Sequence, residues 1–179
     1  PSESTISAIH ATSVRVMGLP EPVDPVPGFE VLANIGSVSE LGQALEMKAE
    51  GIGLYRTEIE LIAAGQLLDE DTLTERYGAA VRSMSGRRII FRMFDLGSDK
   101  PLAALQMPAE DNPALGCRGA RLLLARGDLL RTQARALARA SEHGPIHVMY
   151  PMVSGVEQFR RLRELFAEAT AGLLAGEIL

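Results

Sequence analysis

The chain has 179 residues, of which 46% are hydrophobic and 23% are charged, so it can bury the core of one globular domain. Its formal net charge of -5 offers no basic surface for nucleic acid. A lone cysteine, Cys117, excludes an internal disulfide, and no apolar run approaches the roughly 20 residues of a membrane-spanning helix. We therefore expect a cytoplasmic protein with no membrane insertion.

Residues 1–28 are interpreted as a linker or N-terminal extension. The stretch 18–28, GLPEPVDPVPG, carries four prolines, which disfavour helix and central-strand pairing. Residues 1–17 fit either the tail of a linker or an added strand. The chain opens on Pro1 without a charged n-region or an apolar h-region, so we expect no signal peptide and regard the sequence as part of a longer protein. The domain itself is placed at residues 29–179.

Short apolar runs alternate with stretches of helical spacing from residue 29 onward. Strands are predicted in FEVLANIG (29–36), GIGLYRTE (51–58), RRIIFRMFD (87–95) and IHVMYPMV (146–153). Helices are predicted from Ser37 to about Glu50, over about Asp71 to Met84, over 127–144 with Gly144 as the stop, and from Ser154 onward. The sequence therefore predicts four β-then-α units.

Two of these helices begin with the sequence of a capping box, Ser37 with Glu40 and Ser154 with Glu157. The third and fourth helices each carry one apolar face. In the third, this face consists of Leu129, Leu130, Gln133, Ala134, Leu137 and Ala138. In the fourth, it consists of Val156, Phe159, Leu162, Phe166, Ala169 and Leu173.

Repeated βα units indicate a parallel sheet with right-handed crossovers, either doubly wound or closed as an eight-fold barrel. The segment ANIGSVSE after the first strand has one glycine where a nucleotide-binding loop needs several, which favours the barrel. The predicted fold class is α/β, a partial TIM (β/α)8 barrel with about four βα units.

Arginines occur at the C-terminal ends of the predicted strands, which is where the active-site residues of such a fold lie. Arg56 ends the second strand and Arg92 lies near the end of the third. Arg118 follows a proline and glycine turn that can return it to the same mouth, meaning the edge formed by those strand ends. Three more charged residues follow Arg92 on one loop: Asp95, Asp99 and Lys100.

Two interpretations of these arginines remain open on spacing alone. Together they make a fork-shaped receptor for phosphate or carboxylate, since each guanidinium can donate two parallel hydrogen bonds. Alternatively each is paired with a nearby carboxylate, for example Arg92 with Asp95 or Arg56 with Glu58.

Cys117 invites interpretation as a nucleophile, because the adjacent Arg118 could lower the pKa of its thiol. With no histidine nearby in the sequence, we interpret it as a small packing residue. The histidines, His10, His143 and His147, have no partners at a metal-ligand spacing. We therefore predict no metal site in this chain alone.

Five motifs, VLANIGS, GIGLYRTE, FRMFDLGSDK, EDNPALGCRGARL and VMYPMVS, occur in this order. They resemble the C-terminal domain of phosphoenolpyruvate (PEP)-utilising enzymes, and within that family the PEP-protein phosphotransferases that begin the bacterial sugar phosphotransferase system. The resemblance covers roughly residues 29–153, and the last helix in pattern only. Ser98 departs from the family, which usually has a second glycine in the DIGGDK-type loop.

The resemblance implies an eight-stranded barrel whose mouth binds PEP, with Arg56, Arg92 and Arg118 on the phosphate. It implies transfer of the phosphoryl group to a protein histidine, release of pyruvate and a phosphocarrier protein as partner. In the complete enzymes a Glu and an Asp bind Mg²⁺ and a Cys protonates the enolate. The resemblance places all three beyond this chain, so Cys117 is not that cysteine, and we expect no catalytic residue and no turnover in this chain alone.

Alternatives remain: part of a pyruvate phosphate dikinase or PEP synthase, a non-catalytic PEP- or pyruvate-binding regulatory module, or an α/β domain whose ion pairs are purely structural. A half barrel also exposes two strand edges and apolar interior, which predicts a homodimer.

Overall fold

The computed structural model describes residues 22, 24–98, 102, 105, 107, 110–173 and 175–179. Predictions made for residues 1–21, Asp99 and Lys100 fall outside the described residues. The strands are β1 (Leu32–Ile35), β2 (Gly51–Arg56), β3 (Ile89–Arg92) and β4 (His147–Met149). The α-helices are α2 (Leu41–Glu46), α3 (Glu58–Ala64), α4 (Glu70–Met84), α5 (Ala120–Ala125), α6 (Gly127–Ala140) and α7 (Val156–Thr170). Two 3₁₀ helices, η1 (Val38–Glu40) and η3 (Ser141–His143), complete the described elements.

The strands form one sheet in the order β1-β2-β3-β4, and every neighbouring pair is parallel. This confirms the predicted parallel α/β sheet. The order follows the chain without the reversal that marks a doubly wound sheet. Residues 177–179 lie next to the β4 edge of the sheet. Ile178 forms a parallel bridge with Ile146, and the Leu179 amide donates to the Ile146 carbonyl at 2.9 Å.

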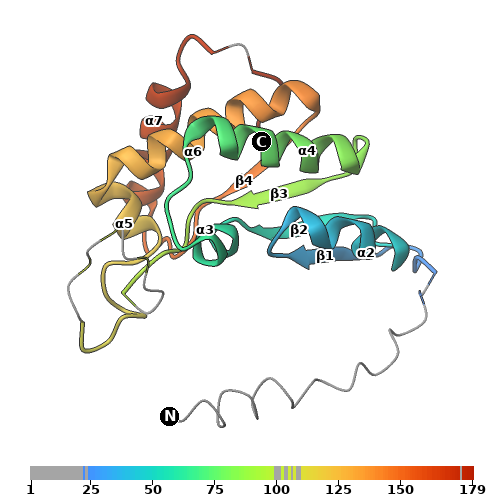
Figure 1. The fold of residues 1–179 in the computed structure, drawn as a ribbon, viewed down its shortest axis with the longest axis horizontal. Helices are drawn as coiled ribbons and strands as arrows, with labels where there is room; N and C mark the ends of the chain where they lie inside the picture. The colour runs from blue at the N-terminus through green and yellow to red at the C-terminus, as the bar shows by residue number, and fades with distance from the viewer. Residues whose placement is uncertain are drawn as a thin grey trace.

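Helices α4, α6 and α7 lie along one side of the sheet, with α4 packed on α6 and α6 on α7 (Figure 1). Three aromatic side chains fill the space between β2, β3 and α4. Tyr55, Tyr77 and Phe91 are each at most 1% exposed, and their ring centroids lie 5.1 to 6.2 Å apart. Truncating any one of them to alanine removes about 3–5 kcal/mol of stability in comparable cores. This aromatic cluster therefore fixes the sheet against the helices.

Side chains on β3 alternate between the two faces of the sheet. Ile89 and Phe91 are buried toward the helices, whereas Ile90 and Arg92 are only half-buried on the other face. Arg56, at the end of β2, is half-buried too. The face away from α4 and α6 therefore presents the arginines.

Helix α2 ends at Glu46, four residues before the predicted end near Glu50. The Ala49 amide donates to the Ala44 carbonyl and the Lys48 amide to the Leu45 carbonyl, which is the Schellman arrangement. Lys48 takes the left-handed position with φ 59, where glycine is more common. The end was missed because no glycine marks it.

Both predicted capping boxes are wrong, because Ser37 makes no capping hydrogen bond through its side chain and the N-cap of α7 is Gly155 instead of Ser154. At the first helix the Glu40 carboxylate instead accepts from the Gly36 amide at 3.3 Å and from the Ser37 hydroxyl at 3.2 Å. At the last helix the Gln158 side chain accepts from the Ser154 amide at 2.9 Å. Helices α3 and α5 were also missed, since each has fewer than two full turns and lies within a segment interpreted as strand or loop.

The predicted apolar face of α6 is confirmed, since all six of its residues are buried. The face of α7 is confirmed in part: Leu162 is buried and Phe166 and Ala169 pack against the core, whereas Val156 and Phe159 are 64% and 41% exposed. Among the described residues no helix combines the length and apolarity needed to cross a bilayer.

Gly51 is required by the close approach of β1 and β3. An added Cβ would lie 2.6 Å from the Arg88 carbonyl oxygen and 2.9 Å from Leu32 Cδ2. We expect Gly51→Ala to lower the free energy of unfolding by about 1–3 kcal/mol, because the strands must move apart. Gly42→Ala is the control, since nothing lies within 4 Å of its Cβ and alanine favours helix. Urea unfolding followed by circular dichroism would compare them, and equal midpoints would contradict this account.

Candidate functional site

Arg56 and Arg92 are neighbours at the mouth. They end β2 and β3, and their Cα atoms are register partners in the parallel pair. Register partners in adjacent strands present their side chains on the same face, about 5 Å apart at the backbone. The structure therefore brings two of the three predicted phosphate-binding residues together.

Arg118 lies at the same mouth, because the backbone of the next residue, Gly119, contacts the loops that follow β3 and β4. The Gly119 amide donates to the Leu96 carbonyl at 3.1 Å, beyond the end of β3, and Gly119 has φ 53. Its Cα lies so close to the loop after β4 that an added Cβ would be 3.0 Å from Met152 Cγ. A glycine is thus needed here for both conformation and space. As the proline and glycine turn predicts, Arg118 returns to the strand ends.

Two buried carboxylates bind these arginines. Asp95 accepts two hydrogen bonds from Arg118, Nε to Oδ1 and Nη2 to Oδ2, each at 2.9 Å. The same Asp95 lies 3.5 Å from Arg92 Nη1, and Arg92 Nη2 donates to Glu58. The carboxylate side chains of Glu58 and Asp95 are only 1% and 6% exposed. The ion-pair alternative is therefore correct for Arg92 with Asp95, whereas Glu58 pairs with Arg92 and not, among the described residues, with Arg56.

Arg56 and Arg92 both keep unused donors. The Nε atoms of both side chains are buried and have no hydrogen-bond partner among the described residues. A buried N–H without an acceptor costs about 1–3 kcal/mol, so each favours an additional acceptor nearby. Three positive charges and two negative charges lie together here, on Arg56, Arg92, Arg118, Glu58 and Asp95. The mouth is thus suited to an anion with several acceptor oxygens.

Glu110 joins the two loops that carry the charged residues. Its carboxylate accepts from the Ser98 hydroxyl at 3.0 Å and from the Cys117 amide at 2.8 Å. The carboxylate also fills the space beside Gly116, where an added Cβ would lie 2.2 Å from Oε2. Ser98, the departure from the family pattern, therefore ties the loop after β3 to the segment that carries Arg118.

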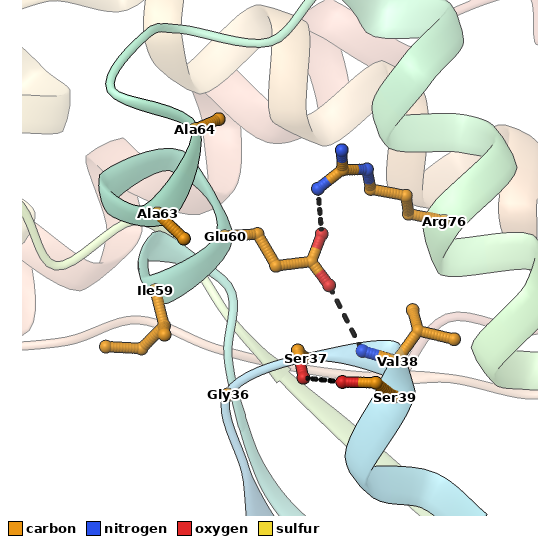
Figure 2. A pocket seen from close by; sticks show the side chains of 9 residues that line it. All are labelled: Gly36, Ser37, Val38, Ser39, Ile59, Glu60, Ala63, Ala64 and Arg76. Atoms are coloured by element: carbon orange, nitrogen blue, oxygen red, sulfur yellow. Dashed lines mark hydrogen bonds and ion pairs between the residues drawn. The ribbon is translucent and has the colours of Figure 1, made fainter.

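A separate hollow of about 410 Å³ lies beside the end of β1 (Figure 2). In it the Glu60 carboxylate accepts from Arg76 Nη1 at 2.8 Å, from the Val38 amide at 3.2 Å and from the Tyr55 hydroxyl. Burial, together with the hydrogen bond to this carboxylate, raises the pKa of Tyr55 well above its usual value. Because Glu60 and Arg76 neutralise each other, this hollow is less suited to an anion than the mouth.

Glu58 and Glu110 are the residues whose part in the site the sequence did not reveal. Glu58 was considered only as a partner for Arg56, its near neighbour in the sequence. Its partner Arg92 lies 34 positions away, and Glu110 meets Ser98 across 12 positions. Cys117 is half-buried and packs against the core, in accord with a packing role. Asp99 and Lys100 stay predictions on the sequence alone.

Removing the Ser98 hydroxyl should loosen the segment that holds Cys117. A hydrogen bond to a carboxylate contributes about 1–2 kcal/mol, so we expect the thiol of Ser98→Ala to react about 5- to 30-fold faster with a thiol reagent. Cys117 is the only cysteine, so the labelling rate reports on this segment alone. Ser154→Ala, in an exposed loop, is the control. An unchanged rate in Ser98→Ala would show that the contact does not restrain the loop.

The comparisons with known proteins agree with these features. The chain matches the family described as PEP-utilising enzyme, PEP-binding domain, over residues 10–178. It is 42% identical to the phosphoenolpyruvate-protein phosphotransferase of Latilactobacillus sakei over 147 residues, 82% of this chain and 26% of that protein. It is 41% identical to the protein of that name from Staphylococcus aureus over 144 residues, 80% of this chain and 25% of the relative.

The Staphylococcus carnosus (strain TM300) protein of the same name is 42% identical over 144 residues, again 80% of this chain and 25% of the relative. The chain thus spans about a quarter of the length of the curated relatives it matches. The extent of the family match and these identities identify the chain as a member of the PEP-utilising enzymes, within their PEP-binding domain.

Proposed function

We propose that this chain supplies the phosphate-binding part of a PEP-protein phosphotransferase, with Arg56, Arg92 and Arg118 holding the phosphate of PEP. The observation that carries the proposal is the pair of buried Nε donors on Arg56 and Arg92, which lack an acceptor among the described residues. Phosphate oxygens are strong acceptors, and guanidinium groups bind them with paired hydrogen bonds.

The three arginines contribute differently in this proposal. Glu58 and Asp95 restrain Arg92 and Arg118 before any ligand arrives, so little side-chain entropy is lost when phosphate binds. Arg56 has no carboxylate partner among the described residues and supplies the uncompensated positive charge. Asp95 belongs to the surroundings of the anion through its contacts with Arg92 and Arg118, whereas the same role for Asp99 and Lys100 stays a prediction from the sequence.

The parent reaction that we propose moves the phosphoryl group of PEP to a protein histidine and releases pyruvate, with a phosphocarrier protein as the next partner. Arginines at the mouth would stabilise charge on the transferred group. The described residues do not fit Mg²⁺ by themselves, because no group of three or more His, Cys, Asp or Glu gathers among them and Glu58 and Asp95 are held by arginines. Residues outside this chain would bind the metal.

We further propose that the sheet continues into a closed (β/α)8 barrel. The strand order, the parallel pairing and the added bridge at Ile178 support this proposal, since a barrel adds each new strand beside the previous one. For the chain by itself we propose a homodimer, because β1 and the segment 177–179 both leave strand edges without a strand partner among the described residues.

Arg56→Ala is the sharpest test of the phosphate site. Among the described residues this change takes the partner from no buried carboxylate, whereas Arg92→Ala would leave Glu58 without the Arg92 guanidinium. We expect calorimetry at low salt to show PEP binding that weakens at least about tenfold in Arg56→Ala, about 1.4 kcal/mol, because a charge-assisted hydrogen bond is lost. Pyruvate, which lacks the phosphate, should bind more weakly than PEP.

Arg126→Ala is the matched control, because Arg126 pairs with Asp128 on the surface. It should bind PEP like the unchanged chain. Equal affinity of Arg56→Ala and Arg126→Ala, or no binding of PEP to the unchanged chain, would refute the phosphate site.

We also expect the isolated chain to form no pyruvate from PEP in the presence of Mg²⁺, because the proposed metal ligands, proton donor and acceptor histidine lie outside it. A coupled pyruvate assay would measure this against a complete PEP-protein phosphotransferase. Pyruvate formation that Arg56→Ala abolishes would show that the chain is catalytically sufficient and overturn this expectation.

A further inference from the structure

Gln133 is a fully buried amide behind the mouth. It lies on the buried face of α6 and has 0% exposure. Its Oε1 accepts from the Phe94 amide at 2.8 Å, and its Nε2 donates to Thr57 Oγ1 at 2.9 Å. Longer contacts of 3.3 Å join Nε2 to the Arg92 carbonyl and to the Tyr77 hydroxyl. One side chain thus contacts both strand ends and a helix.

The groups that Gln133 contacts lie next to the arginines in the chain. Thr57 follows Arg56, and Phe94 comes two residues after Arg92. The Thr57 hydroxyl also donates to the Arg92 carbonyl at 2.7 Å. Gln133 and Thr57 therefore link the backbone after β2 to the backbone after β3, at the place where the regular strand pairing stops.

We infer that Gln133 is a positioning residue, which sets the separation of Arg56 and Arg92 without touching the ligand. The inference rests on the proposed phosphate site. Two guanidinium groups can donate to one phosphate only at a limited range of separations. In enzymes, misplacing a reacting or binding group by about 1 Å can lower the reaction rate by a factor of about 100. An amide is suited to this task because it accepts from one strand end and donates to the other.

A purely structural role would also explain a buried, satisfied amide, since leaving the Phe94 amide without an acceptor is costly. The two roles differ in what a substitution changes. A structural role lowers stability alone, while a positioning role lowers PEP affinity even where the protein is fully folded. The readout is therefore affinity measured on folded protein, beside stability.

The test compares Gln133→Met, which keeps the approximate shape but removes both hydrogen-bonding groups, with Ser141→Ala. Ser141 is also buried and polar, and it accepts from the Gly176 amide at 2.9 Å, in η3 between α6 and β4 and away from the mouth. We expect Gln133→Met to bind PEP at least about tenfold more weakly. Ser141→Ala should bind within twofold of the unchanged chain, although both variants unfold at lower urea concentration.

Thr57→Val is the second variant, in case Gln133→Met does not fold. It removes one hydroxyl of the same network with little change in shape, and it should also weaken PEP binding. If the unchanged chain binds PEP and each variant that folds binds it as tightly as the unchanged chain, the positioning role is refuted while the phosphate site stands. If the unchanged chain does not bind PEP, the phosphate site and the positioning role fall together.

Discussion

The guanidinium of Arg92 lies between two carboxylates, Glu58 and Asp95, and the arrangement of the mouth depends on that contact. Because both carboxylates are almost completely buried, removing one partner of such a pair typically costs 3–5 kcal/mol. Asp95 extends the restraint to Arg118 through two hydrogen bonds. These contacts fix the relative positions of three segments: the end of β3, the start of α3 and the segment before α5.

In the proposed phosphate site, ion pairing and anion binding are complementary. Carboxylates that pair with Arg92 and Arg118 fix their rotamers, and they also reduce the net positive charge at the mouth. The remaining charge comes from Arg56, whose position depends on the register of β2 with β3. The proposed ligand, with several acceptor oxygens, could then accept from the Nε groups of Arg56 and Arg92, which have no hydrogen-bond partner among the described residues.

Secondary structure was predicted most accurately for elements whose own residues carry a clear hydrophobic pattern. Helix α6 has a buried stripe at helical spacing, and the strands have apolar runs bounded by glycine or charge, so both were placed close to where they lie. Helix ends were predicted poorly where a residue other than the expected one makes the capping contact. Gln158 took the place expected for Glu157, and a left-handed Lys48 ended α2 where no glycine signalled it. Local patterns do not encode such competition.

The sequence by itself determined the parallel βα repeat, the family and the presence of arginines at the strand ends, because strand period, helix period and motif order are local properties of the chain. Only the tertiary structure decided which carboxylate pairs with which arginine. Glu58 lies two residues from Arg56 but bonds to Arg92, and the amide of Gln133 reaches Thr57 across 76 positions. Such pairings depend on the register between strands and on the direction in which each helix starts, and these are set by packing of the whole core.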